Sequence, residues 1–194
     1  MQPYEIVAGP LTVYLAAYGT TFPEVDETPG GSWTKLGTSG DKNYSDDGVS
    51  VQLPQSIETF TPAGGTVPRK AMRTEEGLVF GFTLVDFSAE QVAKITDDAA
   101  ITTTAASSGV PGTKRIPLYK GLQVESFALL ARGLSPVNDS LVAQFEVKSA
   151  YQSGEPEPVF NKGEVVGFEL EWTALDTAGD GDPYDLVIQT AAAS

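Results

Sequence analysis

Apolar and polar residues alternate along much of the chain with the period of two that is typical of half-buried β-strands. The alternation is cleanest over residues 165–175, where one face carries Val166, Phe168, Leu170, Trp172 and Ala174 and the other carries Gly167, Glu169, Glu171 and Thr173. Strands are predicted in the same way over residues 11–18, 33–36, 49–53, 56–61, 78–85, 122–131, 141–150 and 165–175. The Asp47-Gly48 pair before the third of these is typical of a turn.

A single α-helix is predicted after the strand at 78–85. Ser88 is a favourable N-cap, and Gln91 stands three residues later, in the position that completes a capping box. Segments 20–32, 64–73 and 98–117 are rich in Gly, Pro or small polar residues and are predicted as loops, the last alternatively as an irregular edge strand. The pattern therefore predicts a mainly β fold, an antiparallel β-sandwich or barrel-like core with one short α-helix and long loops.

The length of 194 residues suits one domain, residues 1–194, with enough apolar residues for a buried core. Three segments within it are expected to lie outside that core. Residues 1–10 are predicted as an N-terminal arm, residues 37–73 as a long loop region, and residues 176–194 as a flexible C-terminal tail.

The charge balance argues against binding to nucleic acid or to anionic membranes. Lys and Arg number 12 against 26 Asp and Glu, so the formal net charge of −14 repels nucleic-acid phosphates and anionic lipid. The same acidity is also ordinary solubility chemistry. The first residues lack a basic region followed by an uninterrupted apolar run, so neither a signal peptide nor a membrane span is predicted and synthesis in a cytoplasm is expected.

Catalytic chemistry finds little support in the residues. The chain has no Cys and no His, which excludes disulfides, thiolate nucleophiles, Cys/His zinc sites and a histidine general base. The loop at 176–185 carries Asp176, Asp180, Asp182 and Asp185, the ligand type that Ca²⁺ prefers. Val187 stands where an EF-hand needs a bidentate Glu, so a solvated acidic turn is the favoured interpretation. No catalytic residue, cofactor or metal site is predicted, and the protein is not expected to be an enzyme.

Three consecutive segments carry a family resemblance. GDKNYSDDGVSVQLPQ is followed by SIETFTPAGGTVPRKAMRTEEG and then by LVFGFTLVDFSAEQVAKI. This order of charged loop, extended runs, Gly/Pro/basic excursion, strand and helix resembles the major tail proteins of long, flexible-tailed bacteriophages. The resemblance implies a structural virion protein, whose subunits close into hexameric rings that stack into the tail tube through which viral DNA reaches the host.

The resemblance also assigns residues and partners. The region 37–73 would contact neighbouring subunits through Asp41, Lys42, Asp46, Asp47, Arg69, Lys70 and Arg73. The three basic residues among them stand out in an acidic chain and suit an acidic surface on a neighbour. Glu169 and Glu171 are candidates for the lumen face. The implied partners are other copies of the chain, the tape measure protein, the tail terminator, distal tail or baseplate proteins, and double-stranded DNA passing without sequence-specific binding, with no membrane. Assembly would take place in the host cytoplasm and the product would reside in the virion.

Two alternatives stay open. A β-sandwich module that binds carbohydrate or protein, or decorates a phage particle, would use exposed aromatics, for which Trp33, Tyr44 and Tyr151 are candidates in or beside loops. An enzyme would require the acidic loop at 176–185 to hold a metal ion that activates water.

Overall fold

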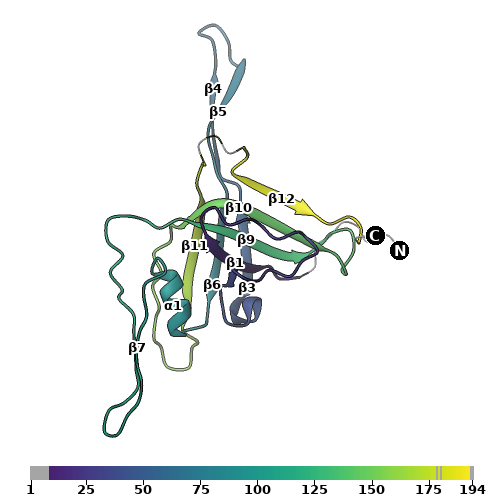
Figure 1. Ribbon diagram of the computed structural model, residues 1–194. Helices are drawn as coiled ribbons and strands as arrows, with labels where there is room; N and C mark the ends of the chain where they lie inside the picture. Colours follow the sequence, from purple (N-terminus) through teal and green to yellow (C-terminus); the bar gives the residue numbers. More distant parts are fainter. Residues whose placement is uncertain (1–8, 178, 180, 193–194) are drawn as a thin grey trace.

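The computed structural model describes residues 9–177, 179 and 181–192. Most of the predicted N-terminal arm at 1–10 therefore lies outside the described residues. Over these residues the fold is mainly β, as the alternation predicts, with a single α-helix, α1, at Ala89–Ile95 and a short 3-10 helix, η1, at Gly40–Asn43 (Figure 1).

An eight-stranded antiparallel sheet forms the body of the molecule. Its main path runs β2-β1-β9-β10-β11-β6-β3, and β12 pairs with β10 beside that path. The strands are β1 (Thr12–Ala17), β2 (Thr34–Lys35), β3 (Tyr44–Gln52), β6 (Val79–Leu84), β9 (Phe127–Leu134), β10 (Val142–Gln152), β11 (Phe168–Ala174) and β12 (Tyr184–Ile188).

Strand β10 belongs to two layers of this sheet. Its first half pairs with β9 on one side and β12 on the other, whereas residues 150–152 pair with β11. The register between β9 and β10 shifts between Val147 and Ala150, which bends the sheet. As a result β1 and β9 cross β3, β6 and β11 at a steep angle (Figure 1), and the two halves face each other across one core.

The core follows the predicted alternation closely. Phe80, Phe82 and Leu84 of β6 are buried, and so are Phe168, Leu170 and Trp172 of β11. The Trp172 ring meets Phe127 of β9 edge to face, with centroids 5.8 Å apart, so the aromatic contact joins the two layers. The period of two therefore identified the buried faces of both strands.

Tyr44 ties the layers together through its hydroxyl group. The hydroxyl accepts a hydrogen bond from the Val13 amide at 3.1 Å and donates one to the Leu36 carbonyl at 2.8 Å. Burial raises the pKa of Tyr44 far above its ordinary value, because the phenolate would lose its water. The side chain therefore acts as a neutral bridge between the start of β3 and the β1–β2 region.

The outer face of the β1–β9 layer is covered by the loop at 18–33. Phe22 and Trp33 pack there at 5.2 Å, and the Trp33 indole donates to the Thr21 carbonyl at 3.1 Å. The Arg132 guanidinium donates to the backbone carbonyls of Glu24 and Glu27 and to the buried Gln144 side chain. These bonds fix a polar loop that has too few apolar residues to pack by itself.

The helix begins at Ser88 as predicted, but the capping box does not form. The Ser88 side chain makes no capping bond, and Asp86 instead accepts hydrogen bonds from the amides of Ser88 at 3.0 Å and Thr38 at 2.7 Å. Gln91 is buried and spans to the β2 side, accepting from the Gly37 amide at 2.9 Å and donating to the Lys35 carbonyl. Gln91 therefore does not complete the capping box, because its side chain forms hydrogen bonds with backbone groups of a distant segment instead.

Three segments differ from the predicted elements. The strand expected at 122–131 begins only at Phe127, and Leu122 is fully exposed. Asp47-Gly48 lies inside strand β3 and does not make a turn. The positive φ of Gly48, 70°, falls where the register between β3 and β6 is irregular, as in a β-bulge. Part of the expected C-terminal tail, Tyr184–Ile188, is strand β12 on the edge of β10.

Replacing Tyr44 by Phe tests the bridge between the layers. The variant leaves the Val13 amide and the Leu36 carbonyl without their partner in the core, which costs roughly 1–3 kcal/mol of unfolding free energy. Urea unfolding followed by tryptophan fluorescence measures the loss. Tyr119→Phe is the matched control, because Tyr119 is 84% exposed and its loss of a hydroxyl should leave stability unchanged. Equal midpoints for the two variants would contradict the bridge.

Candidate assembly surfaces

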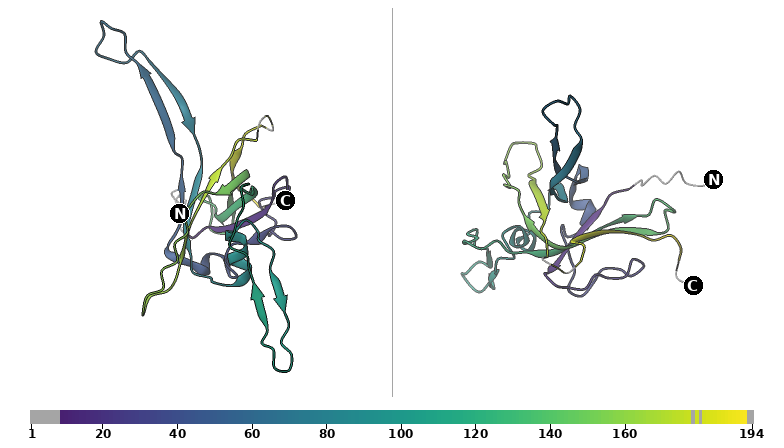
Figure 2. Two further views of the ribbon diagram at one scale, coloured as in Figure 1. Left: turned by 90° about the vertical axis from the view of Figure 1, so that its left-hand side faces the viewer. Right: turned by 90° about the horizontal axis from the view of Figure 1, so that it is seen from above.

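A long β-hairpin leaves the body at the end of β3. It consists of β4 (Gln55–Phe60) and β5 (Lys70–Glu76), which form a two-stranded sheet of their own. The hairpin projects far beyond the other strands in two perpendicular views (Figures 1 and 2). The predicted loop at 64–73 is thus partly a strand, because Lys70 to Arg73 pair with the strand predicted at 56–61.

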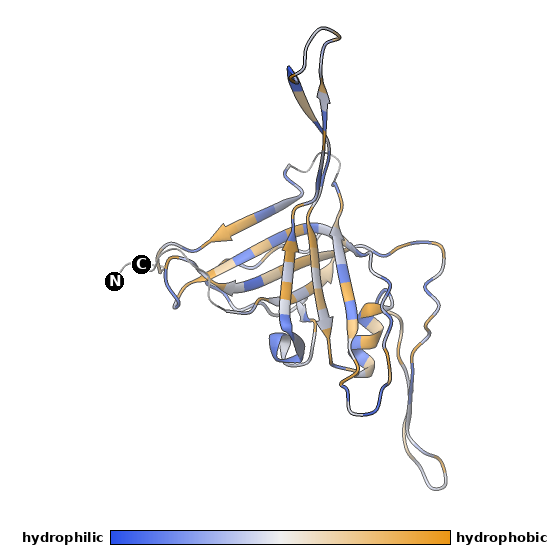
Figure 3. Ribbon diagram, turned by 180° about the vertical axis from the view of Figure 1, so that it is seen from behind, coloured by the Kyte–Doolittle hydropathy of each residue, from blue (hydrophilic) through white to orange (hydrophobic). Residues whose placement is uncertain are grey.

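Every residue of the two hairpin strands is exposed, including several large apolar ones. The exposed apolar residues of the hairpin and its tip are Ile57, Phe60, Val67 and Met72. Figure 3 shows these apolar stretches interleaved with polar ones along the projection. An isolated two-stranded hairpin is marginally stable in water, and exposed apolar side chains of this kind mark contact surfaces.

The basic residues of the hairpin differ in how freely they can meet a partner. Lys70 pairs with Phe60 in the register, and the Arg69 amide donates to the Phe60 carbonyl at 2.8 Å, so both lie next to the tip. Arg73 lies nearer the body, where its guanidinium contacts Glu76 at 2.7 Å and Gln55 at 3.2 Å. Arg69 and Lys70 form no ion pair within the part of the chain that the structure describes.

The other contact residues predicted within 37–73 lie at the opposite end of β3. Asp41 is in η1 and accepts a hydrogen bond from the Thr12 hydroxyl at 2.9 Å, which holds η1 against β1. Lys42, Asp46 and Asp47 are exposed beside it. The region is therefore not one loop, and its predicted contact residues separate into a basic tip and a mainly acidic base.

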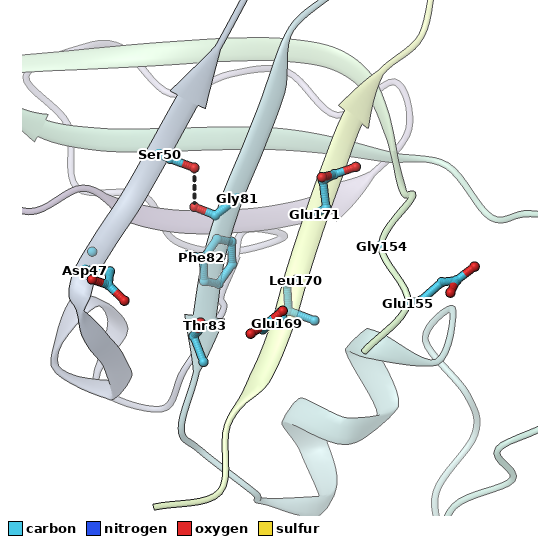
Figure 4. Close-up of a pocket in the computed structure, with 11 residues that line it drawn as sticks. Asp47, Ser50, Gly81, Phe82, Thr83, Gly154, Glu155, Glu169, Leu170 and Glu171 are labelled. Atoms are coloured by element: carbon cyan, nitrogen blue, oxygen red, sulfur yellow. Dashed lines mark hydrogen bonds between the residues drawn. The ribbon is translucent and has the colours of Figure 1, made fainter. Parts of the chain in front are cut away.

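Glu169 and Glu171 project from the outer face of β11, opposite to the core (Figure 4). With Asp47 and Glu155 they rim a shallow cavity of about 370 Å³ over β3, β6 and β11. Its floor is open because Gly81 and Gly154 lack side chains; a Cβ on Gly81 would lie 2.8 Å from the Ser50 hydroxyl, which donates to the Gly81 carbonyl. We call this surface the acidic face. Among the described residues, no three or more Asp or Glu side chains lie together in a way that could hold a metal ion. Asp180 of the acidic loop at 176–185 lies outside these residues.

A second projection lies within residues 98–117, which the sequence predicts as a loop or an irregular edge strand. Strands β7 (Thr102–Thr104) and β8 (Thr113–Arg115) form a thin two-stranded hairpin that extends from the helix side of the body, away from the β4–β5 hairpin (Figure 1). The segment that returns from it to β9 exposes Leu118, Tyr119, Leu122 and Val124. The sequence predicts a strand from residue 122, but among the described strands none pairs with residues 116–126.

The aromatic candidates for sugar binding are largely unavailable. Trp33 and Tyr44 are buried, at 8% and 7% exposure, and the polar atom of each side chain forms a hydrogen bond with a backbone group. Tyr151 is half-buried within β10. No described helix is long and apolar enough to cross a membrane.

The fold has a counterpart among solved structures. Neither a protein-family model nor a curated protein matches the sequence. A chain in the cryo-EM structure of the anti-feeding prophage baseplate, symmetrised six-fold, superposes with a TM-score of 0.50. This chain shares that fold. The match covers 94% of this chain and 95% of the other at 10% sequence identity.

Hydrogen exchange tests how independent the β4–β5 hairpin is. In dispersed protein we expect the amides of β4 and β5 to exchange about a thousandfold faster than those of β6, or more, since core strands open only at a cost of ~5 kcal/mol or above. Mass spectrometry of peptides covering 54–77 and 78–85 makes the comparison within one sample. Equal protection of both peptides would show that the hairpin is stabilised by the body.

Proposed function

We propose that this protein is a structural subunit of a phage tail or a phage-derived particle, and that its copies form rings that stack into a tube. One observation carries the proposal: a body with a complete core sends out two solvent-exposed hairpins in opposite directions, and the longer one, β4–β5, exposes four large apolar side chains. Such projections are unfavourable in a monomer and are expected where copies contact one another. The shared fold with an anti-feeding prophage baseplate chain supports the same class of role.

Ring closure would use the open edges of the sheet. Strand β3 ends the sheet path, and it pairs only with β6 among the described strands. An edge of nine residues that stays unpaired is an aggregation hazard, which closed rings remove by pairing edges between copies. We propose six copies per ring, in keeping with the six-fold symmetry of the baseplate that holds the similar chain.

The acidic face would line the lumen in such a ring. It continues across β3, β6 and β11, the strands that neighbouring copies would extend. Carboxylates such as Glu169 and Glu171 repel the phosphates of passing DNA, so the wall would offer no binding site to slow it. In this role the protein acts through assembly rather than catalysis, and it would reside in the virion.

A ring of the baseplate is a second candidate, and the comparison favours it because the similar chain comes from a baseplate. The two roles require the same core and differ in whether rings continue to stack. Electron microscopy of purified protein over a concentration series separates them, because a tube subunit gives hollow tubes of uniform width and indefinite length, whereas a baseplate ring gives single rings. Dispersed monomers at all concentrations would count against both.

Removing the outer β4–β5 hairpin should abolish stacking while leaving the body folded. Residues 57–74 are replaced by Asn-Gly, which closes the hairpin at the Ser56↔Glu75 pair with a two-residue turn. Because no core residue lies in the removed segment, the urea midpoint should stay close to that of the unmodified protein. Tubes formed by this variant would refute the role of the hairpin.

A cysteine at Glu171 tests the lumen assignment, since the chain contains no other. In dispersed Glu171→Cys protein, a small maleimide and a bulky polyethylene-glycol maleimide should both react. In assembled tubes the small reagent should still react, whereas the bulky one should be blocked except near the tube ends. Full reaction with the bulky reagent would place Glu171 on the outside, and loss of both reactions would place it in a subunit contact.

A further inference from the structure

A cavity of about 520 Å³ opens at the end of the body opposite to the β4–β5 hairpin. It lies between the first residues of β3, the last of β6 and the loop at 153–167 that leads into β11. In two views that differ by a right angle, this loop and the hairpin extend from opposite ends of the same three strands (Figures 1 and 2). We call it the end cavity.

The rim of the end cavity is acidic. Its carboxylates come from three separate segments, and they are Asp46, Glu157, Glu164 and Glu169. None of them forms an ion pair with a described cation; Glu164 accepts a hydrogen bond from the Asn161 side-chain Nδ2 at 3.0 Å. The loop contributes Lys162 as its single cation. The cavity therefore presents unneutralised negative charge to whatever approaches this end.

Apolar side chains surround the same opening. Val159 and Val165 line the cavity and are 54% and 78% exposed. Next to Val159, Phe160 is 70% exposed and meets the Phe87 ring at 5.8 Å, which in turn stacks on Phe168 at 4.7 Å. An exposed aromatic side chain resting on another half-exposed one gains little from the monomer, so a partner is needed to bury them.

The tip of the hairpin has the complementary chemistry. Arg69 and Lys70 are exposed cations without ion-pair partners among the described residues, and Phe60 and Val67 beside them are 60% and 71% exposed. The tip thus combines two positive charges with two apolar side chains, and the end cavity combines four carboxylates with three valines, of which Val159 and Val165 are exposed. Complementary charges of this kind select a partner and fix its orientation.

We infer that the hairpin tip of one copy docks in the end cavity of the next copy. Arg69 and Lys70 would then face the carboxylates of the rim, while Phe60 and Val67 would cover Val159 and Val165. Donor and acceptor lie at opposite ends of each copy, so the contact is heterologous and repeats without limit along one direction. The inference rests on the proposed function and names the surface that receives the hairpin.

Disulfide trapping tests the contact directly, because the chain is free of cysteine. The double variant Val67→Cys/Val159→Cys, oxidised under mild conditions, should give a ladder of covalent oligomers on a non-reducing gel. Each single variant forms at most a covalent dimer and serves as a control. The pair Val67→Cys/Ser50→Cys reports docking on the acidic face instead. A ladder from this second pair, or none from the first, would overturn the inference.

Charge exchange provides an independent readout of the same contact. Arg69→Glu/Lys70→Glu should reduce the assembled fraction at least tenfold at low salt, as should Glu157→Lys/Glu164→Lys. Combining all four changes should restore assembly. If the unmodified protein forms tubes but the combined variant does not recover, the end cavity is not the acceptor and the proposed function stands. If the trapped ladder forms without any rings or tubes, the contact stands and the proposed function fails.

Discussion

The sharing of β10 between two layers is the constraint on which the rest of this structure depends. A single strand that pairs with β9 and β12 along its first half and with β11 along its last residues forces the sheet to bend at the register shift after Val147. The bend sets β1 and β9 across β3, β6 and β11, and it lets Trp172 and Phe127 meet in one core. None of the buried residues of this core comes from β4, β5, β7 or β8.

Several side chains around this core form hydrogen bonds with backbone groups of other segments. Tyr44, Asp86 and Gln91 each form hydrogen bonds with two backbone groups near the junction of η1, β2 and α1. Arg132 does the same for the loop over the other layer. Buried backbone groups must find partners wherever strands of different layers approach without pairing, and side chains supply them here. These side chains connect η1, β2, α1 and the 18–33 loop to the sheet that carries the projecting hairpins and the acidic face.

The candidate surfaces were only partly accessible to sequence reasoning. The cluster of Arg69, Lys70 and Arg73 stood out by charge alone, and Glu169 and Glu171 stood out because the alternation of β11 puts them opposite to the buried residues. What the sequence did not show is that Asp46 and Asp47 lie a full strand length away from the basic cluster, at the other end of β3. Nor did it show the end cavity, which brings Asp46 of β3 next to carboxylates of the 153–167 loop and β11, two consecutive segments that are distant from β3 in the chain.

The class of the fold, the α-helix and the buried faces of β6 and β11 could be predicted from the sequence, because alternation and helix starts are local properties of each segment. Tertiary structure alone decided that residues 70–76 form a strand, that residues 184–188 return to the edge of β10, and that Gln91 serves β2 instead of its own helix. Each of these outcomes depends on which partner arrives from elsewhere in the chain. A hydrogen-bonding group or an edge strand pairs with whichever segment the bend of the sheet brings close to it. Such long-range contacts cannot be predicted from local sequence.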